Sequence, residues 1–351
     1  MSTWDAVSQL PLEVEGYGLR LLKLPAPGFV RVSTEIALHG GGAVGRGEDV
    51  TYEAADHDAL HAAGTPLALA GAWTLGGFCE YIGTLDLFPS EPHDEVYRRY
   101  RRWGFESAAL DLALRQAGLA LHEALGLRPA PVVFVASVRL PEPPTLAPVD
   151  ARLAQQPGLR FKLDPTASWD EALVAELARR GIVATADLKG FYSGTSVDNA
   201  ADPALYRLIA EGLPDAWIED PALTAQTEPV LAAHHDRITW DAPIHSVADV
   251  LALAFPPRTL NVKPSRFGSV AGLFEFYDHC RVHAIALYGG GQTELGVGRG
   301  QIQYLASLFH PDSPNDVAPA AYNREPLPAG LPGSPLAPAP SVTGFRWGEG
   351  E

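Results

Sequence analysis

Acidic and basic residues follow short apolar segments at regular intervals in the second half of the chain. In VATADLKGFYSG, residues 183–194, four small residues that suit a buried strand precede Asp187 and Lys189. Side chains of residues two positions apart on a strand point to the same face. Because charged groups are costly to bury unless they are paired or bind a metal, this arrangement indicates chemistry at the end of the strand.

The same kind of strand end recurs along the chain. Ionisable residues end five successive predicted strands: Arg160 and Lys162, Asp187 and Lys189, Glu219 and Asp220, Asp241, and Lys263. Three converging carboxylates repel one another without a cation between them, and Mg²⁺ prefers such oxygen ligands. A lysine beside a metal and a second cation, such as Lys162 near Arg160, can act as a general base. The structural alternative is a set of salt bridges between these acids and the lysines.

The elements that position these residues alternate in type from residue 132 onward. Seven strand-like segments are separated by helix-like ones, with a further strand expected near DVAPAAYN, residues 316–323. This alternation predicts a parallel sheet and favours an α/β fold with a (β/α) barrel, in which active sites lie at the C-terminal ends of the strands. Residues 129–324 form the predicted barrel.

The first part of the chain has a different pattern. Strand-like runs at residues 14–24, 29–41 and 43–50 indicate a small antiparallel sheet, and helices are predicted at 93–104 and 106–126, the latter capped by Gly126. Residues 1–128 are therefore predicted to form an α+β cap that includes the helix entering the barrel. Residues 325–351 are rich in proline and are predicted to return to the cap as an extended segment.

The composition argues against several classes of function. Of the 351 residues 46% are hydrophobic, and the net charge of -16 disfavours binding to nucleic acid. Cys79 and Cys280 lie far apart without metal-type spacing, which suits a reducing compartment. We find no signal-peptide pattern and no long apolar run, so a cytoplasmic protein without a membrane partner is expected.

The motifs together resemble the enolase superfamily, and within it the muconate-lactonising subgroup that includes o-succinylbenzoate synthases and dipeptide epimerases. The resemblance is carried by R-x-K at 160–162, D-x-K at 187–189, WIEDP at 217–221, WDAP at 240–243, NVKPSRFG at 261–268 and GGGQTELG at 289–296. It implies a modified TIM barrel whose capping domain is formed by the N-terminal region and the C-terminal tail.

The resemblance also implies a site. Asp187, Glu219 and Asp241 match the ligands of Mg²⁺, with Mn²⁺ as an alternative, and Lys162 and Lys263 match the paired acid/base lysines. In this family the metal binds a substrate carboxylate, a base removes the α-proton, and the metal stabilises the resulting enediolate. The substrate is thus expected to be a small carboxylate.

Three positions depart from the pattern or admit two interpretations. Arg160 stands where the subgroup usually has a lysine, so it is either a clamp for the substrate carboxylate or part of a structural pair. Lys189 stands where relatives usually have a neutral amide, so it is either catalytic or the permanent partner of Asp187 or Glu219. Glu294 either binds substrate or caps the start of a helix.

We interpret the chain as a lyase of the dehydrating o-succinylbenzoate-synthase type. The first alternative is a racemase or epimerase of an amino-acid derivative or dipeptide. The second is a non-catalytic binding relative, in which Lys189 takes the electrostatic place of the metal. Substrate choice is expected to depend on residues 24–28 and 49–58, and the oligomeric state is left open, with a homo-oligomer as one option.

Overall fold

A computed structural model describes residues 2–26, 29–195, 197–324 and 326–348. Its N-terminal part is built on an antiparallel sheet of β2 (Gly16–Ala26), β3 (Phe29–Gly40) and β4 (Ala43–Asp49). A second, two-stranded sheet joins β1 (Pro11–Val14) to β5 (Gly71–Thr74). The helices of this region are α1 (Asp5–Ser8), α2 (Ala54–Ala63), α3 (Leu75–Thr84), α4 (Val96–Ala117) and α5 (Leu121–Leu125).

Helix α4 replaces two helices that the sequence predicted separately. The chain stays helical through Gly104 and Phe105 because both are buried in the packed interior. It ends instead at Gly118, which adopts a left-handed conformation with φ of 68°. The predicted cap at Gly126 is confirmed, and it ends the shorter helix α5.

Close contact between β4 and α4 depends on two glycines. A Cβ atom at Gly45 would lie 2.2 Å from the carbonyl oxygen of Ala108, and one at Gly47 would lie 2.1 Å from that of Gly104. Backbone atoms cannot move aside as a flexible side chain can, so only glycine permits this approach. The helix that leads into the barrel is thereby held directly against the cap sheet.

The second part of the chain forms the barrel. Five parallel strands lie in the order β10 (Ile238–Thr239), β9 (Trp217–Glu219), β8 (Val183–Asp187), β7 (Arg160–Leu163) and β6 (Val135–Val138), and β11 (Thr259–Val262) pairs with β12 (Ala286–Gly289). The Asn261 N–H donates to the carbonyl of Trp240 at 3.0 Å and links the two sheets. Single bridges from Asn315 to Phe134 and from Asp316 to Gly290 close the circle.

Helices surround these strands on the outside. They are α6 (Ala147–Leu153), α7 (Glu171–Arg180), α8 (Pro203–Gly212), α9 (Glu228–Leu231), α10 (Val247–Leu251), α11 (Pro264–Phe267), α12 (Val270–Val282) and α13 (Val297–Phe309), with 3₁₀ turns η1 (Ala232–Arg237) and η2 (Ala320–Asn323). The side chains of Asp170, Asp202 and Ser269 cap α7, α8 and α12. Helix α9 is a single turn that continues into η1, no residue of which is buried.

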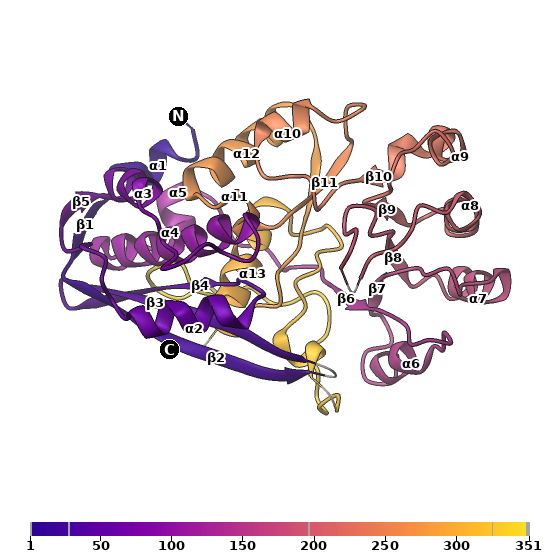
Figure 1. Cartoon of the computed structure of the whole chain (residues 1–351), viewed down its shortest axis with the longest axis horizontal. Coiled ribbons are helices and arrows are strands. Elements are labelled where there is room, and N and C mark those ends of the chain that lie inside the picture. Colours follow the sequence, from indigo (N-terminus) through magenta and orange to yellow (C-terminus); the bar gives the residue numbers. More distant parts are fainter. Residues whose placement is uncertain (1, 27–28, 196, 325, 349–351) are drawn as a thin grey trace.

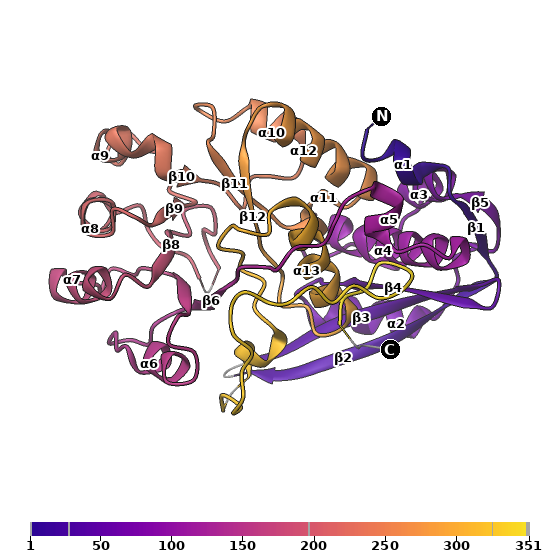
Figure 2. The ribbon, with the colours of Figure 1, turned by 180° about the vertical axis from the view of Figure 1, so that it is seen from behind.

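The prediction of a (β/α) barrel with an α+β cap is confirmed. The cap elements lie together on one side, and the strands β6 to β10 with helices α6 to α9 lie on the other (Figure 1). The view from behind places α13 between them, and both termini lie on the cap side (Figure 2). The predicted eighth strand is reduced to the bridging residues Asn315 and Asp316, because Pro314 and Pro319 on either side cannot donate to a ladder.

Two buried charged side chains join the cap to the barrel. The guanidinium of Arg31 on β3 donates to the carbonyls of Val50 at 2.7 Å and of Gln292 at 2.9 Å. The carboxylate of Glu48 on β4 accepts N–H groups from Leu295 and Gly298 at 2.7 and 2.9 Å, around the start of α13. These bonds hold the loop after β12 in place.

The C-terminal segment also contacts the cap. Phe345 donates its N–H to the carboxylate of Asp111 on α4 at 2.7 Å, and Arg346 binds the same carboxylate at 2.8 Å. The predicted domain limits remain predictions, and residues 325 and 349–351 of the tail lie outside the described residues. In the described part of the chain, no helix has the length and apolar content needed to cross a membrane.

We predict that Gly47→Ala destabilises the protein by about 1–3 kcal/mol or more, because the new methyl group overlaps the backbone of α4. The free energy of unfolding, measured by urea denaturation, checks this. Gly16→Ala is the matched control, in strand β2 of the same sheet, where a Cβ atom meets nothing within 4 Å. Equal stability of the two variants would contradict the described contact between β4 and α4.

Candidate active site

Three carboxylates gather at the C-terminal ends of neighbouring strands. Asp187 ends β8, Glu219 ends β9 and Asp220 follows directly, and all three are completely buried. One oxygen from each lies within 4.8 Å of the others. This donor set of carboxylate oxygens suits a hard divalent cation such as Mg²⁺.

The two lysines expected to act as acid and base lie on either side of these carboxylates. Lys162 on β7 places its Nζ 2.9 Å from Asp187 Oδ2 and 2.5 Å from Glu219 Oε1. Lys263 follows β11 and places its Nζ 2.9 Å from Asp241 Oδ2. Because β8, β9 and β10 separate the two strands, the lysines approach from opposite sides of the barrel mouth.

Asp220 holds the backbone that carries the predicted ligand Asp241. Its two oxygens accept the N–H groups of Asp241 at 2.8 Å and Ala242 at 2.9 Å. Asp220 itself has a φ of 48°, an uncommon conformation for a residue with a side chain. Both of its oxygens are thus engaged by the backbone, so Asp220 acts on Asp241 as a positioning residue. Sequence reasoning assigned Asp220 no role, although an acid directly after Glu219 was a signal.

Arg266 and Tyr192 both contact the carboxylate of Asp241. Arg266 Nη1 lies 3.1 Å from Asp241 Oδ1, and Arg266 Nη2 donates to the hydroxyl of Tyr192 at 2.9 Å. That hydroxyl in turn lies 3.3 Å from Asp241 Oδ2. Sequence reasoning missed both residues. The arginine three positions after Lys263 was the available signal, whereas nothing marked the tyrosine.

Glu219 is oriented by two neutral donors. The hydroxyl of Tyr288 on β12 donates to Oε2 at 2.7 Å, and the amide of Asn261 on β11 donates to Oε1 at 3.2 Å. Both partners are buried. Together with the Lys162 ammonium at Oε1, these donors fix the orientation of the Glu219 carboxyl group.

The acids of the site fall into two groups, one with raised and one with lowered pKa values. Burial raises the pKa of Glu219 to about 8 and that of Asp220 to about 7, and nearby carboxylates add to the effect. Burial also opposes ionisation of Asp187, but Lys162 and Lys189 outweigh it and lower the pKa of that carboxyl. Arg266 and Lys263 lower the pKa of Asp241 in the same way. Four cations thus face these four acids, and Asp164 and Asp316 nearby add two further carboxyl groups.

Lys189 lies within the cluster, while two other predicted site residues do not. The Lys189 ammonium contacts Asp187 Oδ2, as one of its two predicted roles requires. Arg160 begins β7 and donates to the carbonyl of Val183 at 3.1 Å, at the opposite end of the strands. Glu294 is buried, accepts the N–H of Gln292 at 2.6 Å and lies 3.0 Å from Arg299, so its contacts shape the loop after β12.

Exposed apolar groups directly follow the first segment expected to choose the substrate, residues 24–28, and lie within the second, residues 49–58. Phe29 and Val30, at the tip of the hairpin between β2 and β3, are exposed by 58% and 51%. Tyr52 stacks on Arg31 and donates its hydroxyl to Gln292. Residues 27 and 28 of the first segment lie outside the described residues.

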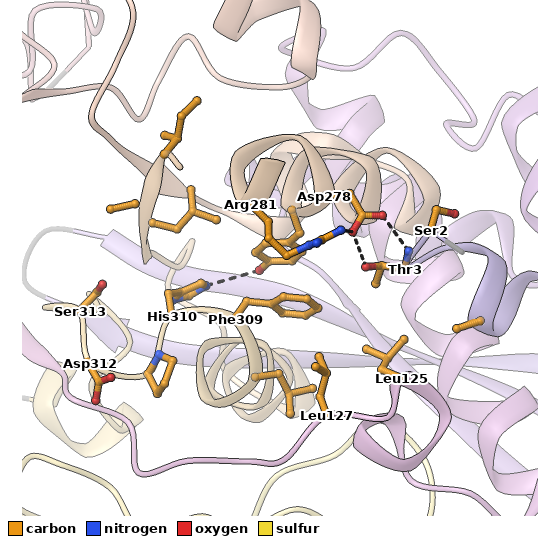
Figure 3. Close-up of a pocket in the computed structure, with 17 residues that line it drawn as sticks. Ser2, Thr3, Leu125, Leu127, Asp278, Arg281, Phe309, His310, Asp312 and Ser313 are labelled. Atoms are coloured by element: carbon orange, nitrogen blue, oxygen red, sulfur yellow. Dashed lines mark hydrogen bonds and ion pairs between the residues drawn. The ribbon is translucent and has the colours of Figure 1, made fainter. Parts of the chain in front are cut away.

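A separate hollow of about 780 Å³ opens at the other end of the barrel. It lies beside Ala286 at the start of β12, between α12, α13 and α1 (Figure 3). Leucines and Phe309 form much of its wall, and Asp278 and Arg281 lie at one side. None of the cluster carboxylates lines it, so it is not the site of the chemistry considered above.

Comparison with known proteins agrees with this geometry. Residues 5–124 match the N-terminal domain, and residues 128–324 the C-terminal domain, of a family described as domain of unknown function DUF8230. An o-succinylbenzoate synthase of Bacillus subtilis (strain 168) is 29% identical over 254 residues, which cover 66% of this chain and 63% of the synthase. The match therefore spans less than two thirds of that relative.

Solved structures share the fold over most of the chain. An unknown member of the enolase superfamily from Enterococcus faecalis V583 has a TM-score of 0.66 at 20% identity and covers 88% of this chain and 86% of its own. A dipeptide epimerase from Methylococcus capsulatus, complexed with a Mg ion, has a TM-score of 0.63 at 20% identity and covers 93% and 92%. The chain thus belongs to the DUF8230 family and has the fold of the enolase superfamily, as its motifs predicted.

Proposed function

We propose that this protein is a Mg²⁺-dependent enzyme that removes the α-proton of a small carboxylate substrate. Asp187, Glu219 and Asp241 are the proposed metal ligands, with Mn²⁺ as an alternative ion. The observation that carries the proposal is the placement of two buried ammonium groups, Lys162 and Lys263, on opposite sides of the carboxylate cluster. Such a pair can address both faces of a substrate carbon held between them.

A bound divalent ion would supply Lewis-acid stabilisation of negative charge on the substrate carboxylate. The residues of the chain supply the rest. Burial disfavours the charged form of Lys162, but Asp187 and Glu219 outweigh it and raise its pKa well above the ordinary value. When these carboxylates serve as ligands, Lys162 loses the partners that keep it protonated and can accept a proton. Lys263 contacts Asp241, the third proposed ligand, on the other side of the site, and the positive charge of Arg266 beside it opposes protonation of its amine.

Within this reaction class we favour a lyase of the o-succinylbenzoate-synthase type. The similarity to the Bacillus subtilis synthase supports it, and so does the presence of extra cationic groups, Lys189 and Arg266, beside the site. Elimination needs a base on one face only. A cation on the other face can stabilise the charge that develops in the transition state.

A racemase or epimerase is the second candidate. The specific observation in its favour is that both lysines are buried and each contacts a proposed metal ligand, Asp187 for Lys162 and Asp241 for Lys263, so neither face lacks a candidate base. The dipeptide epimerase among the structural neighbours supports the same candidate. The two candidates differ in whether the second lysine must exchange a proton.

We predict that Glu219→Gln weakens Mg²⁺ binding at least about tenfold while leaving the fold intact. The amide matches the neutral carboxyl that burial favours at this position, so it removes a ligand charge without removing the contact to Tyr288. Isothermal titration calorimetry measures the affinity. Glu211→Gln, on the exposed face of α8, is the matched control. Equal Mg²⁺ affinity of the two variants would refute the proposed ligand set.

We predict unequal effects of Lys162→Ala and Lys263→Ala on exchange of the substrate α-proton with solvent deuterium. The substrate is first identified by screening succinylated and dipeptide carboxylates, and exchange is then followed by mass spectrometry. Lys162→Ala should abolish exchange, and Lys263→Ala should retain part of it, because a lyase uses one base. Lys23→Ala, an exposed lysine in the cap, is the control. If each variant instead lost exchange for a different enantiomer of the substrate, each lysine would serve one face and the result would favour a racemase.

A further inference from the structure

Lys189 lies between two acidic side chains rather than one. Its ammonium contacts Asp187 Oδ2 and lies 3.7 Å from Asp164 Oδ1. Asp164 directly follows β7, two positions after Lys162, so both residues point to the same face of the barrel wall. The side chains of Lys189 and Asp164 are only 14% and 13% exposed. The ion pair is therefore shielded from most of the solvent.

Asp164 has an unused acceptor. Its Oδ1 is buried and has no hydrogen-bond partner among the described residues. A buried carboxylate oxygen without a partner is unfavourable, so such an atom in a native structure calls for an explanation. The ammonium closest to it is that of Lys189, just beyond hydrogen-bond distance.

Asp187 Oδ2, in contrast, has two cationic partners. It receives two ammonium groups, Lys189 and Lys162, the latter at 2.9 Å. The two positive charges lie close enough to repel each other. The other oxygen of Asp187, Oδ1, accepts the backbone N–H of Lys189 at 3.1 Å. Binding of a metal through Oδ2 therefore requires at least one lysine to move.

The loops that carry this pair are fixed to each other. Asn199 donates its side-chain amide to the carbonyl of Pro165 at 2.9 Å and to that of Leu188 at 3.3 Å. Pro165 follows Asp164 and Leu188 precedes Lys189, so the bonds hold the two ends of the pair side by side. Only the lysine side chain, not the backbone, needs to change position for the ammonium to reach Asp164.

We propose that Asp164 is the positioning residue that receives the Lys189 ammonium when Asp187 binds a divalent cation. The inference rests on the proposed function, because it assumes that Asp187 is a metal ligand. Paired with Asp164, Lys189 stays charged at the mouth of the barrel and can donate a hydrogen bond to a substrate oxygen there. This arrangement explains how a lysine can stand at this position without preventing metal binding.

Arg139 is a third cation that acts on Asp164, besides Lys189 and Lys162. It follows β6 and is exposed, and its influence on the Asp164 carboxyl is smaller than that of Lys189 or Lys162. If Arg139 were the functional partner of Asp164, Lys189 would be free to stay on Asp187. Arg139→Met is therefore the control that separates the two partners.

The test is a double-mutant cycle read by Mg²⁺ affinity. Isothermal titration calorimetry with MgCl₂ is carried out on the unaltered protein, Asp164→Asn, Lys189→Met and the double variant, with thermal melting as the check of folding. Asp164→Asn should weaken Mg²⁺ binding at least about tenfold, because Lys189 then remains on Asp187. In the Lys189→Met background the same change should alter affinity by less than about threefold, and Lys189→Met alone should tighten binding. Arg139→Met should leave the affinity within about twofold of the unaltered protein.

Equal weakening by Asp164→Asn in both backgrounds, or no weakening in either, would overturn the inference while leaving the proposed function intact. Failure of the unaltered protein to bind Mg²⁺ would overturn both. Should Asp164→Asn fold poorly, Asp164→Ser provides a smaller polar replacement, and the same comparison between backgrounds applies.

Discussion

The need to balance buried negative charge governs the architecture of this barrel mouth. Six carboxylates share the region with four cationic side chains: Asp164, Asp187, Glu219, Asp220, Asp241 and Asp316 against Lys162, Lys189, Lys263 and Arg266. Unpaired charges are expensive away from water, so an excess of two acids must be neutralised by protons or by a cation. The raised pKa values of Glu219 and Asp220 correspond to neutralisation by protons, and a bound divalent ion would provide the alternative.

The cap fixes the loop after β12, which borders the barrel mouth. Arg31 and Glu48 tie the cap sheet to the loop after β12, and Gln292 in that loop donates to the hydroxyl of Tyr100 on α4. Helix α4 can reach this position because Gly47 lets it approach β4. The packing of the cap and the geometry of the charged cluster are therefore parts of one structure, joined through the loop after β12.

The sequence was sufficient to predict the placement of residues that follow the two-residue period of a strand. Lys162, Asp187 and Glu219 lie on inward positions of parallel strands, and the alternation of strands and helices predicted the barrel that brings them together. It could not predict contacts that depend on loop geometry. Asp220 binds the backbone 21 residues further on only because its φ is positive. Arg160 was grouped with Lys162 by the same two-residue period, but it lies at the start of the strand, where its side chain reaches a carbonyl instead.

Asp187, Glu219 and Asp241 are proposed to hold a divalent cation, while Asp220 supports the backbone of Asp241. Anomalous diffraction from crystals soaked in MnCl₂ tests this proposal most directly, because the ion and its ligands are seen together. We predict one manganese site bounded by oxygens of Asp187, Glu219 and Asp241, with Asp220 still accepting the N–H groups of Asp241 and Ala242. A manganese ion ligated by Asp220 in place of Asp241, or no ion at this mouth, would contradict it.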